Sequence, residues 1–219
     1  MTEMVFRQLD VSTAEIDATE ARYEPLAEAV RELVAVTILS EAGDDVVASA
    51  IAAVREVTAS LRAEVRTDHA GVNYNGEGRS WNWGNAGSGQ RNAIAPPIRL
   101  VTNPDGSTYA DLVLGAAYEG PPGCVHGGVS ALLLDHLMGV TASQMDRPTF
   151  TGTLTLRYRN PLPLGPVRVE GRIVREEGRK VFVEASITGS SGLALEADGV
   201  FITPVWSPTL QPALETTQD

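Results

Sequence analysis

One segment limits the possible folds more than any other. Residues 120–142, GPPGCVHGGVSALLLDHLMGVTA, predict a helix from about Gly127 to Ser143. At about 100° per residue, apolar side chains cover most of the circumference of this helix. A helix that is apolar nearly all round is buried. The chain therefore needs other elements that wrap a single central helix.

Alternating apolar and polar residues predict strands on both sides of that helix. The strands cover 98–101 and 108–114 before it, and 151–159, 167–176, 180–190 and 193–204 after it. In TLTLRYR, Leu154, Leu156 and Tyr158 share one face, which is the pattern of a half-buried antiparallel strand. Turn signals at 103–106 and at Glu177-Gly178 separate neighbouring strands. One helix wrapped by an antiparallel sheet is an α+β fold.

Changes in composition divide the 219 residues into four parts. They are an N-terminal helical extension (1–70), a Gly- and Asn-rich connector (71–90), the main domain (91–205) and a polar C-terminal tail (206–219). In the extension we expect a loose lead-in over 1–21 and then two helices within 23–66, each with one apolar face. Gly43 marks the break between these helices, and Asp44 or Asp45 is expected to cap the second one. The pair is interpreted as a helical hairpin that leans on another surface.

Charge and cysteine content exclude several classes of protein. The net charge is −11, and residues 1–70 alone hold 14 acidic and 6 basic side chains, so nucleic acid is not the expected partner. Cys124 is the lone cysteine, which excludes an internal disulfide and argues against a cysteine-built metal site. No run of about 20 apolar residues predicts a membrane span, and the first residues do not resemble a secretory signal. These observations favour a cytoplasmic protein.

An acidic residue, Asp135, stands in the middle of the apolar helix. Its helical neighbours Ala131, Gly139 and Ala142 are small, and no arginine or lysine lies one turn away to pair with it. A buried carboxylate is costly unless it is paired or used. A distant arginine or backbone amides are the structural alternatives to a functional role.

The start of the same helix is suited to bind an anion. His126, Gly127 and Gly128 open it, and the first N–H groups of a helix carry partial positive charge without an internal partner. Glycine leaves these groups accessible to an anion, or to a carbonyl oxygen that becomes one.

The spacing of these two features predicts a dimer. Gly127 and Asp135 are eight residues apart, which is about 12 Å along a helix at about 1.5 Å per residue. One copy of the helix cannot easily bring both to one small reacting group. Two antiparallel copies related by a two-fold axis place Gly127 of one chain opposite Asp135 of the other. We therefore expect a homodimer with two equivalent interface sites, and further pairing into tetramers stays open.

Three segments in the right order resemble the hotdog thioesterases of the phenylacetic-acid-degradation type. More closely, they resemble the animal acyl-CoA thioesterases called thioesterase superfamily members. The segments are Gly120-Pro121-Pro122-Gly123 with His126-Gly127-Gly128 and Asp135; Thr151 with Leu154, Tyr158 and 161–164; and 177–183. The resemblance covers residues 91–205. It implies a hotdog fold, in which an antiparallel sheet wraps one long helix, and hydrolysis of an acyl-coenzyme A to a free acid and CoA.

The resemblance also implies roles for individual residues. Asp135 is expected to be the nucleophile or the general base, and the Gly127 amide, joined by that of Gly128, to polarise the thioester carbonyl. His126 is expected to orient the site or the substrate, and Thr151 to position water or the aspartate of the neighbouring subunit. No metal or cofactor is implied, since CoA arrives as part of the substrate. The candidates for its phosphates are Arg157, Arg159, Arg179 and Lys180.

Two other functions remain open on the same scaffold. One is a hydratase acting on an enoyl thioester, which needs an aspartate and a histidine that converge on the substrate. The other is a non-catalytic acyl-CoA sensor with the N-terminal helices as its output. His136 lies about 100° from Asp135 around the helix, so we interpret it as a core or interface residue. Trp81 and Trp83 either pack on the main domain or form a wall for an acyl chain.

Overall fold

The computed structural model describes residues 6–67, 71–143 and 147–205. The expected tail over 206–219 lies outside these residues. The chain forms two compact units. The first is Met1–Asn85 with Gly89–Ala93, and the second is Ala86–Ser88 with Ile94–Asp219. Within the described residues, no helix is long and apolar enough to cross a membrane.

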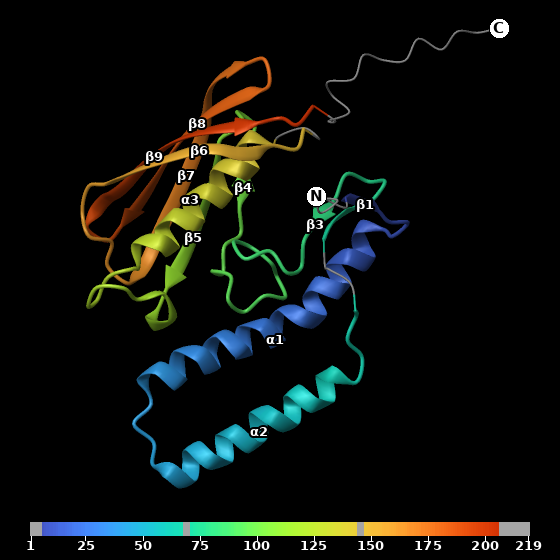
Figure 1. Ribbon diagram of the computed structural model, residues 1–219, viewed down its shortest axis with the longest axis vertical. Helices are drawn as coiled ribbons and strands as arrows, with labels where there is room; N and C mark the ends of the chain where they lie inside the picture. Colours follow the sequence, from blue (N-terminus) through green and yellow to red (C-terminus); the bar gives the residue numbers. More distant parts are fainter. Residues whose placement is uncertain (1–5, 68–70, 144–146, 206–219) are drawn as a thin grey trace, which may run out of the picture. The chain divides into compact units, whose positions relative to one another are not determined.

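The first unit joins two helices to a small sheet. Its elements are β1 (Phe6–Gln8), α1 (Thr13–Leu39), α2 (Asp44–Arg62), β2 (Val72–Tyr74) and β3 (Ser80–Trp81). The sheet has the order β1-β2-β3, with β1 parallel to β2. The two predicted helices are confirmed, and Figure 1 shows them running in opposite directions. The expected amphipathic pattern is clear in α2, which nevertheless buries none of its residues, but it is weak in α1.

Two local expectations for this unit are wrong. The loose lead-in is helical from Thr13, because Ser12 and Glu15 form a capping box in which each side chain accepts a hydrogen bond from the other's backbone N–H. Asp44 and Asp45 do not cap α2; Gly43 is its N-cap, and the two acids lie in its first turn. There they still favour the helix by facing its positive end.

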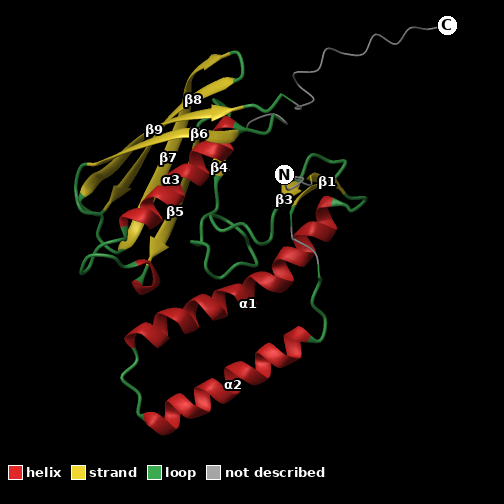
Figure 2. Cartoon of the chain, viewed as in Figure 1, coloured by secondary structure: helices red, strands yellow, loops and turns green. Residues whose placement is uncertain are grey.

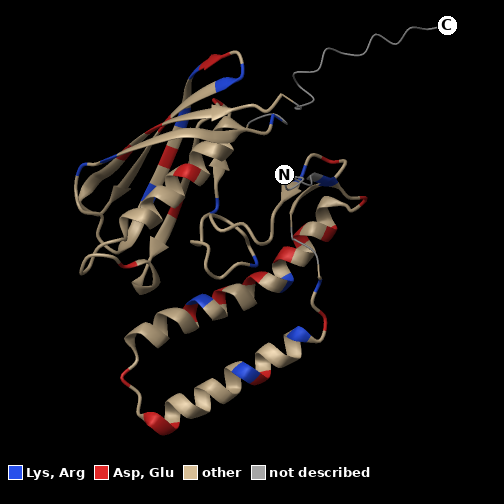
Figure 3. Cartoon of the chain, in the orientation of Figure 1, with Lys and Arg blue, Asp and Glu red and all other residues tan. Residues whose placement is uncertain are grey.

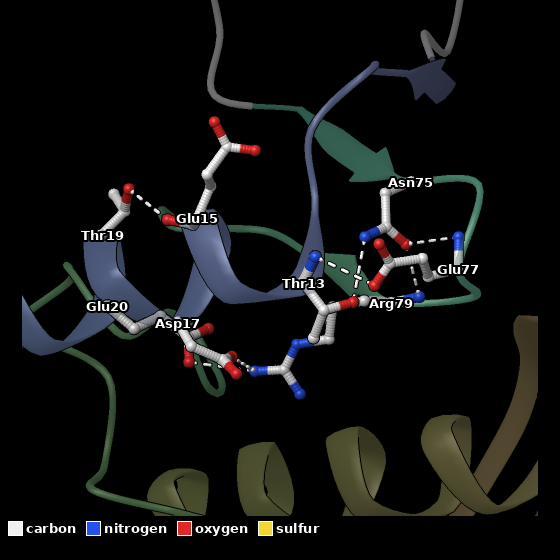
Figure 4. A network of polar contacts seen from close by, with 8 residues as sticks. All are labelled: Thr13, Glu15, Asp17, Thr19, Glu20, Asn75, Glu77 and Arg79. Carbon is white, nitrogen blue, oxygen red and sulfur yellow. Dashed lines mark hydrogen bonds and ion pairs between the residues drawn. The ribbon is translucent and has the colours of Figure 1, made fainter.

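The connector expected over 71–90 contains strands β2 and β3, whose hairpin is bound to the start of α1 (Figure 4). Buried Asn75 donates to the Thr13 hydroxyl over 3.1 Å, and the Thr13 N–H donates to the Glu77 carboxylate over 3.1 Å. Arg79 adds an ion pair with Glu20 at 3.0 Å. These contacts, rather than a hydrophobic pattern, order the segment.

The tryptophans of this segment pack within the first unit. Trp81 is buried, and its ring centroid lies 6.1 Å from that of Trp83. The Arg91 guanidinium lies over the Tyr23 ring at 3.4 Å and 5.9 Å from the centroid of Trp83. Aromatic and cation–π packing therefore accounts for both tryptophans.

The second unit has one helix lying along a six-stranded antiparallel sheet (Figure 2). Its elements are β4 (Val101–Thr102), β5 (Thr108–Leu114), the short 3-10 helix η1 (Ala116–Tyr118), α3 (Gly127–Ala142), β6 (Phe150–Tyr158), β7 (Gly165–Glu177), β8 (Lys180–Gly189) and β9 (Gly192–Ile202). The strand order is β4-β5-β7-β8-β9-β6. This is the predicted α+β arrangement. The prediction of a strand at 98–101 is wrong, however, because strand pairing begins only at Val101, after two prolines.

The core fills the space between α3 and the sheet. Leu133, Leu134, Leu137 and Met138 of α3 are fully buried. They belong to one cluster with Val169, Val183, Ile187 and Phe201 from the strands. The sheet covers one side of α3, and on the other side Ala131, Leu132, Asp135 and Gly139 are only half-buried.

Candidate active site

A tight turn sets the start of α3. The Gly120 N–H donates to the Cys124 carbonyl over 2.9 Å, and the Gly123 N–H donates to the Glu119 carboxylate over 2.6 Å. Gly123 has φ +70°, a conformation that favours glycine. A Cβ on Gly120 would lie 2.6 Å from the Cα of His126, so only glycine fits there. The turn therefore fixes where His126 begins the helix.

His126 is the N-cap of α3, and its ring accepts a hydrogen bond within the helix start. The Gly128 N–H donates to His126 Nδ1 over 2.9 Å, which places the ring proton of the neutral imidazole on Nε2. The His126 carbonyl accepts from Val129 and Ser130. Within the described residues, the Gly127 N–H has no acceptor. Of the two expected amides, only that of Gly127 is therefore open, because the ring of His126 engages the other.

Tyr158 holds the same turn from the sheet. Its hydroxyl donates to the Gly127 carbonyl over 2.9 Å, and its ring lies 3.3 Å from the position that a Cβ on Gly127 would take. The sequence placed Tyr158 only on the apolar face of its strand. An aromatic residue with a polar tip at the end of a strand was the available signal for this contact.

Asp135 lies on α3 eight residues beyond Gly127, and the helix between them is unbroken. The two residues are therefore about 12 Å apart along the axis, as expected. The Thr151 hydroxyl donates to Asp135 Oδ1 over 2.7 Å. The second oxygen, Oδ2, has no partner among the described residues. One oxygen is thus held in place while the other is available for chemistry.

A β-bulge in β6 brings Thr151 to Asp135. Leu154 packs toward the core, so regular alternation would turn Thr151 to the opposite face. The register with β9 shifts between Thr151 and Thr153, and Gly152 is the extra residue. Thr151 therefore bonds to the aspartate of its own chain, and its expected action on water or on the aspartate of the neighbouring subunit stays a prediction.

His136 packs against the short loop 86–88 of the same unit. A Cβ on Gly87 would lie 2.9 Å from the His136 ring. Burial lowers the pKa of this imidazole, and the charge of Asp135 opposes that shift to a smaller extent. The neutral ring is therefore favoured, in agreement with its interpretation as a packing residue.

Arg157 and Arg159 lie away from Asp135. Leu156 packs on the core, so Arg157 points to the outer face of the sheet, where it pairs with Asp198. Arg159 pairs with Glu196 at 2.7 Å. Further pairs of Arg168 with Asp111 and of Arg172 with Glu184 give the strands the mixed charge seen in Figure 3. These guanidinium groups already have carboxylate partners, which weakens their assignment to phosphates.

Arg179 and Lys180 lie at the turn between β7 and β8. The Arg179 guanidinium donates to the Thr203 carbonyl over 3.2 Å. Lys180 is in register with Ile202, which pairs in turn with Phe150. Both therefore lie at the end of the sheet that holds Thr151. Among the described residues, neither pairs with a carboxylate.

The candidate residues thus form two clusters along α3. One is the Gly127 amide, held by His126 and Tyr158, and the other is the Asp135 carboxylate, held by Thr151. Within the part of the chain that the structure describes, no three His, Cys, Asp or Glu side chains are placed to hold a metal ion. An amide donor can stabilise a developing oxyanion and a carboxylate can act as a general base, so the two groups are suited to hydrolysis of an activated acyl group.

Several known proteins are similar to parts of this chain. Residues 122–194 match the family model described as Thioesterase superfamily. The acyl-coenzyme A thioesterase THEM4 of Xenopus laevis is 40% identical over 91 residues, which are 40% of this chain and 41% of that protein. THEM4 of Mus musculus is 35% identical over 91 residues, 40% of this chain and 39% of that protein. The chain thus matches about two fifths of the length of these curated relatives.

A crystallised thioesterase superfamily protein is similar over a longer stretch. It has a TM-score of 0.73 and 29% identity, and the match covers 82% of this chain and 90% of that one. The second unit alone cannot supply so large a share of the chain. The similarity therefore extends into the first unit, beyond the region that the family model matches.

Proposed function

We propose that this protein, whose second unit has the hotdog fold of the thioesterase superfamily, hydrolyses acyl-coenzyme A thioesters in a homodimer. The observation that carries the proposal is the position of the two clusters relative to β6. Asp135 is bound to Thr151 near the start of this strand, and Gly127 is bound to Tyr158 at its end. The two halves of the site thus lie at opposite ends of one strand.

The strand β6 offers a surface for a second copy. It is the last strand of the sheet, and no described strand pairs with its outer edge. An exposed edge of nine residues is a template for pairing with another chain. If two copies of β6 pair antiparallel about a two-fold axis near Leu154, Thr151 of one lies opposite Tyr158 of the other.

That pairing would unite the two clusters. Asp135 of one chain would stand beside the Gly127 amide of its partner, and the half-buried side of α3 would be covered by the same side of the second helix. The distance of about 12 Å within one helix then presents no obstacle, because each reaction centre takes one cluster from each chain. The dimer holds two such centres.

The chemistry follows from the two groups. The thioester carbonyl oxygen accepts a hydrogen bond from the Gly127 N–H, which stabilises the negative charge that develops on that oxygen. As a general base, Asp135 takes a proton from water while the water oxygen bonds to the carbonyl carbon. The C–S bond then breaks, and the CoA sulfur leaves with that proton as the free thiol. As a nucleophile, Asp135 would instead form an anhydride that water cleaves.

The remaining roles are assigned by position and charge. Arg179 and Lys180 are our candidates for the CoA phosphates, since they lie at the Thr151 end of the sheet and pair with no carboxylate of the described residues. His126 orients the amide at the helix start. The reaction uses no cofactor beyond the CoA carried by the substrate, and we place it in the cytoplasm, where a lone cysteine is unexceptional.

A thiol-release assay with short, long and aromatic acyl-CoAs tests the proposal. The wild-type protein should release CoA from at least one class, and Asp135→Asn should lower kcat by about 10²–10⁴-fold, the range for removing a general base. The change keeps the shape of the side chain, so thermal unfolding should show a folded dimer. Binding of acyl-CoA without thiol release, or full turnover by Asp135→Asn, would contradict the proposal.

A further inference from the structure

The peptide group between Gly127 and Gly128 is held at both ends. Its carbonyl accepts the Tyr158 hydroxyl over 2.9 Å, and its N–H donates to His126 Nδ1 over 2.9 Å. The bonds reach this peptide from two separate elements, an edge strand and the cap of the helix. A peptide plane fixed by both its donor and its acceptor cannot rotate freely.

The preceding peptide, between His126 and Gly127, is fixed from its carbonyl side. That carbonyl accepts the N–H groups of Val129 over 2.9 Å and of Ser130 over 3.2 Å. The Gly127 N–H belongs to this same peptide and is left without an acceptor among the described residues. Its direction is therefore set by hydrogen bonds on both sides of Gly127.

This support is needed because the segment is otherwise easily deformed. Two consecutive glycines have the greatest backbone freedom of any pair, and helix ends fray. A polarising amide contributes to a reaction only when it already points to where charge will develop. A free helix start built from Gly127 and Gly128 would not meet that condition without further contacts.

We infer that Tyr158 is a positioning residue for the Gly127 amide, an inference that rests on the proposed function. The phenol ties the first carbonyl of α3 to the sheet, and the ring packs 3.3 Å from the Cβ position of Gly127, where any side chain would compete for space. Tyr158 acts through the backbone and does not itself react. Its strand also holds Thr151, so β6 orients both halves of the chemistry.

The variant Tyr158→Phe isolates this role. Phenylalanine keeps the ring against Gly127 and removes only the hydroxyl, while the Gly127 carbonyl keeps its place in the helical ladder. We expect kcat to fall by about 10-fold with KM unchanged, since losing a supporting hydrogen bond behind a functional group costs about that much. Tyr109→Phe is the matched control, because it removes a hydroxyl from the same sheet and keeps the ring beneath Arg168.

Amide signals of ¹⁵N-glycine-labelled protein give a readout independent of turnover. In Tyr158→Phe the signals of Gly127 and Gly128 should shift and their hydrogen exchange should quicken, and neither should change in Tyr109→Phe. In an active protein, an unchanged kcat for Tyr158→Phe overturns the inference. If the wild-type protein hydrolyses no acyl-CoA, the proposed function fails by itself, and unchanged glycine signals would then overturn the inference separately.

Discussion

Gly127 combines three properties that no other residue of the helix shares. It is the first helical residue, its N–H lacks an acceptor among the described residues, and the Tyr158 ring occupies the space beside its Cα. The preceding residue, His126, has φ −61° and ψ 132°, an extended conformation that suits a residue before proline. Proline is also favoured at the first position of a helix. Proline at position 127 should therefore remove the amide N–H while the helix keeps its start.

We expect Gly127→Pro to remove the proposed polarising amide without unfolding the helix. Gly127→Ala adds a similar Cβ contact with Tyr158 but keeps the N–H, so the pair separates crowding from loss of the donor. Measured by thiol release, kcat should fall by about 10²–10³-fold in the proline variant and much less in the alanine variant. Equal activity of the two variants, with equal thermal stability, would show that this amide is not the donor.

At the residue scale, the sequence predicted the candidate site residues better than it predicted their contacts. Asp135 was identified because a buried charge in an apolar helix is costly unless it is paired or used. Gly127 was identified because glycine leaves the N–H groups at the helix start accessible. The hydrogen bond from the Gly128 N–H to His126 and the hydroxyl contact of Tyr158 were not predicted. Alternation tells which face a side chain takes, but not which polar atom it will meet across 31 residues of chain.

Among the elements, β6 shows how one glycine redirects a strand. The bulge at Gly152 turns Thr151 toward α3, and a Cβ on this glycine would lie 2.7 Å from Ile202 Cδ1 and 3.2 Å from the Val200 carbonyl oxygen. The bulge therefore has little room for a side chain. Sequence alternation cannot reveal such an inserted residue, so the contact of Thr151 with Asp135 of the same chain was not predicted.

The hydroxyl of Thr151 tests the contact that the bulge permits. We expect Thr151→Val to lower kcat by about 10–100-fold in the thiol-release assay, because it removes the hydrogen bond to Asp135. Thr155→Val, on the outer face of the same strand, is the control. A Thr151→Val variant with the wild-type kcat would contradict a role for this hydrogen bond in the reaction.

The other elements were predictable where hydrophobic periodicity defined them. The helix α3, the hairpin at Gly178 and the long strands were found because burial imposes their periods. The start of α1 and the β2–β3 hairpin were missed, because a capping box at Ser12 and a side-chain network around Asn75 determine them. Each of these signals consists of a few polar residues, and a polar segment is easily interpreted as a loop.

At the scale of the whole molecule, the proposed site belongs to the assembly rather than to one chain. We expect mixtures of Asp135→Asn and Gly127→Pro protomers to recover activity after unfolding and refolding together. Each mixed dimer has one centre with both groups intact and one with both altered. Random mixing makes half of the dimers mixed, so activity should return to about a quarter of the wild-type value.

The separate variants, refolded alone, are the controls for this experiment. If both clusters acted within one chain, every chain in the mixture would lack one group and no activity would return. Mass measurement of the refolded species should show the dimer in every sample. Recovery therefore distinguishes a shared centre from an intramolecular one without knowledge of the acyl group.

The unbroken helix α3 from Gly127 to Ala142 has a consequence for how this protein can vary. It works as a ruler, because each residue adds about 1.5 Å of length and about 100° of rotation. Replacing a residue between the two functional positions changes neither quantity. Adding or removing one swings the carboxylate about a quarter of a turn away from Thr151. Substitutions between Gly127 and Asp135 therefore leave the relative position of the two residues unchanged, whereas insertions and deletions do not.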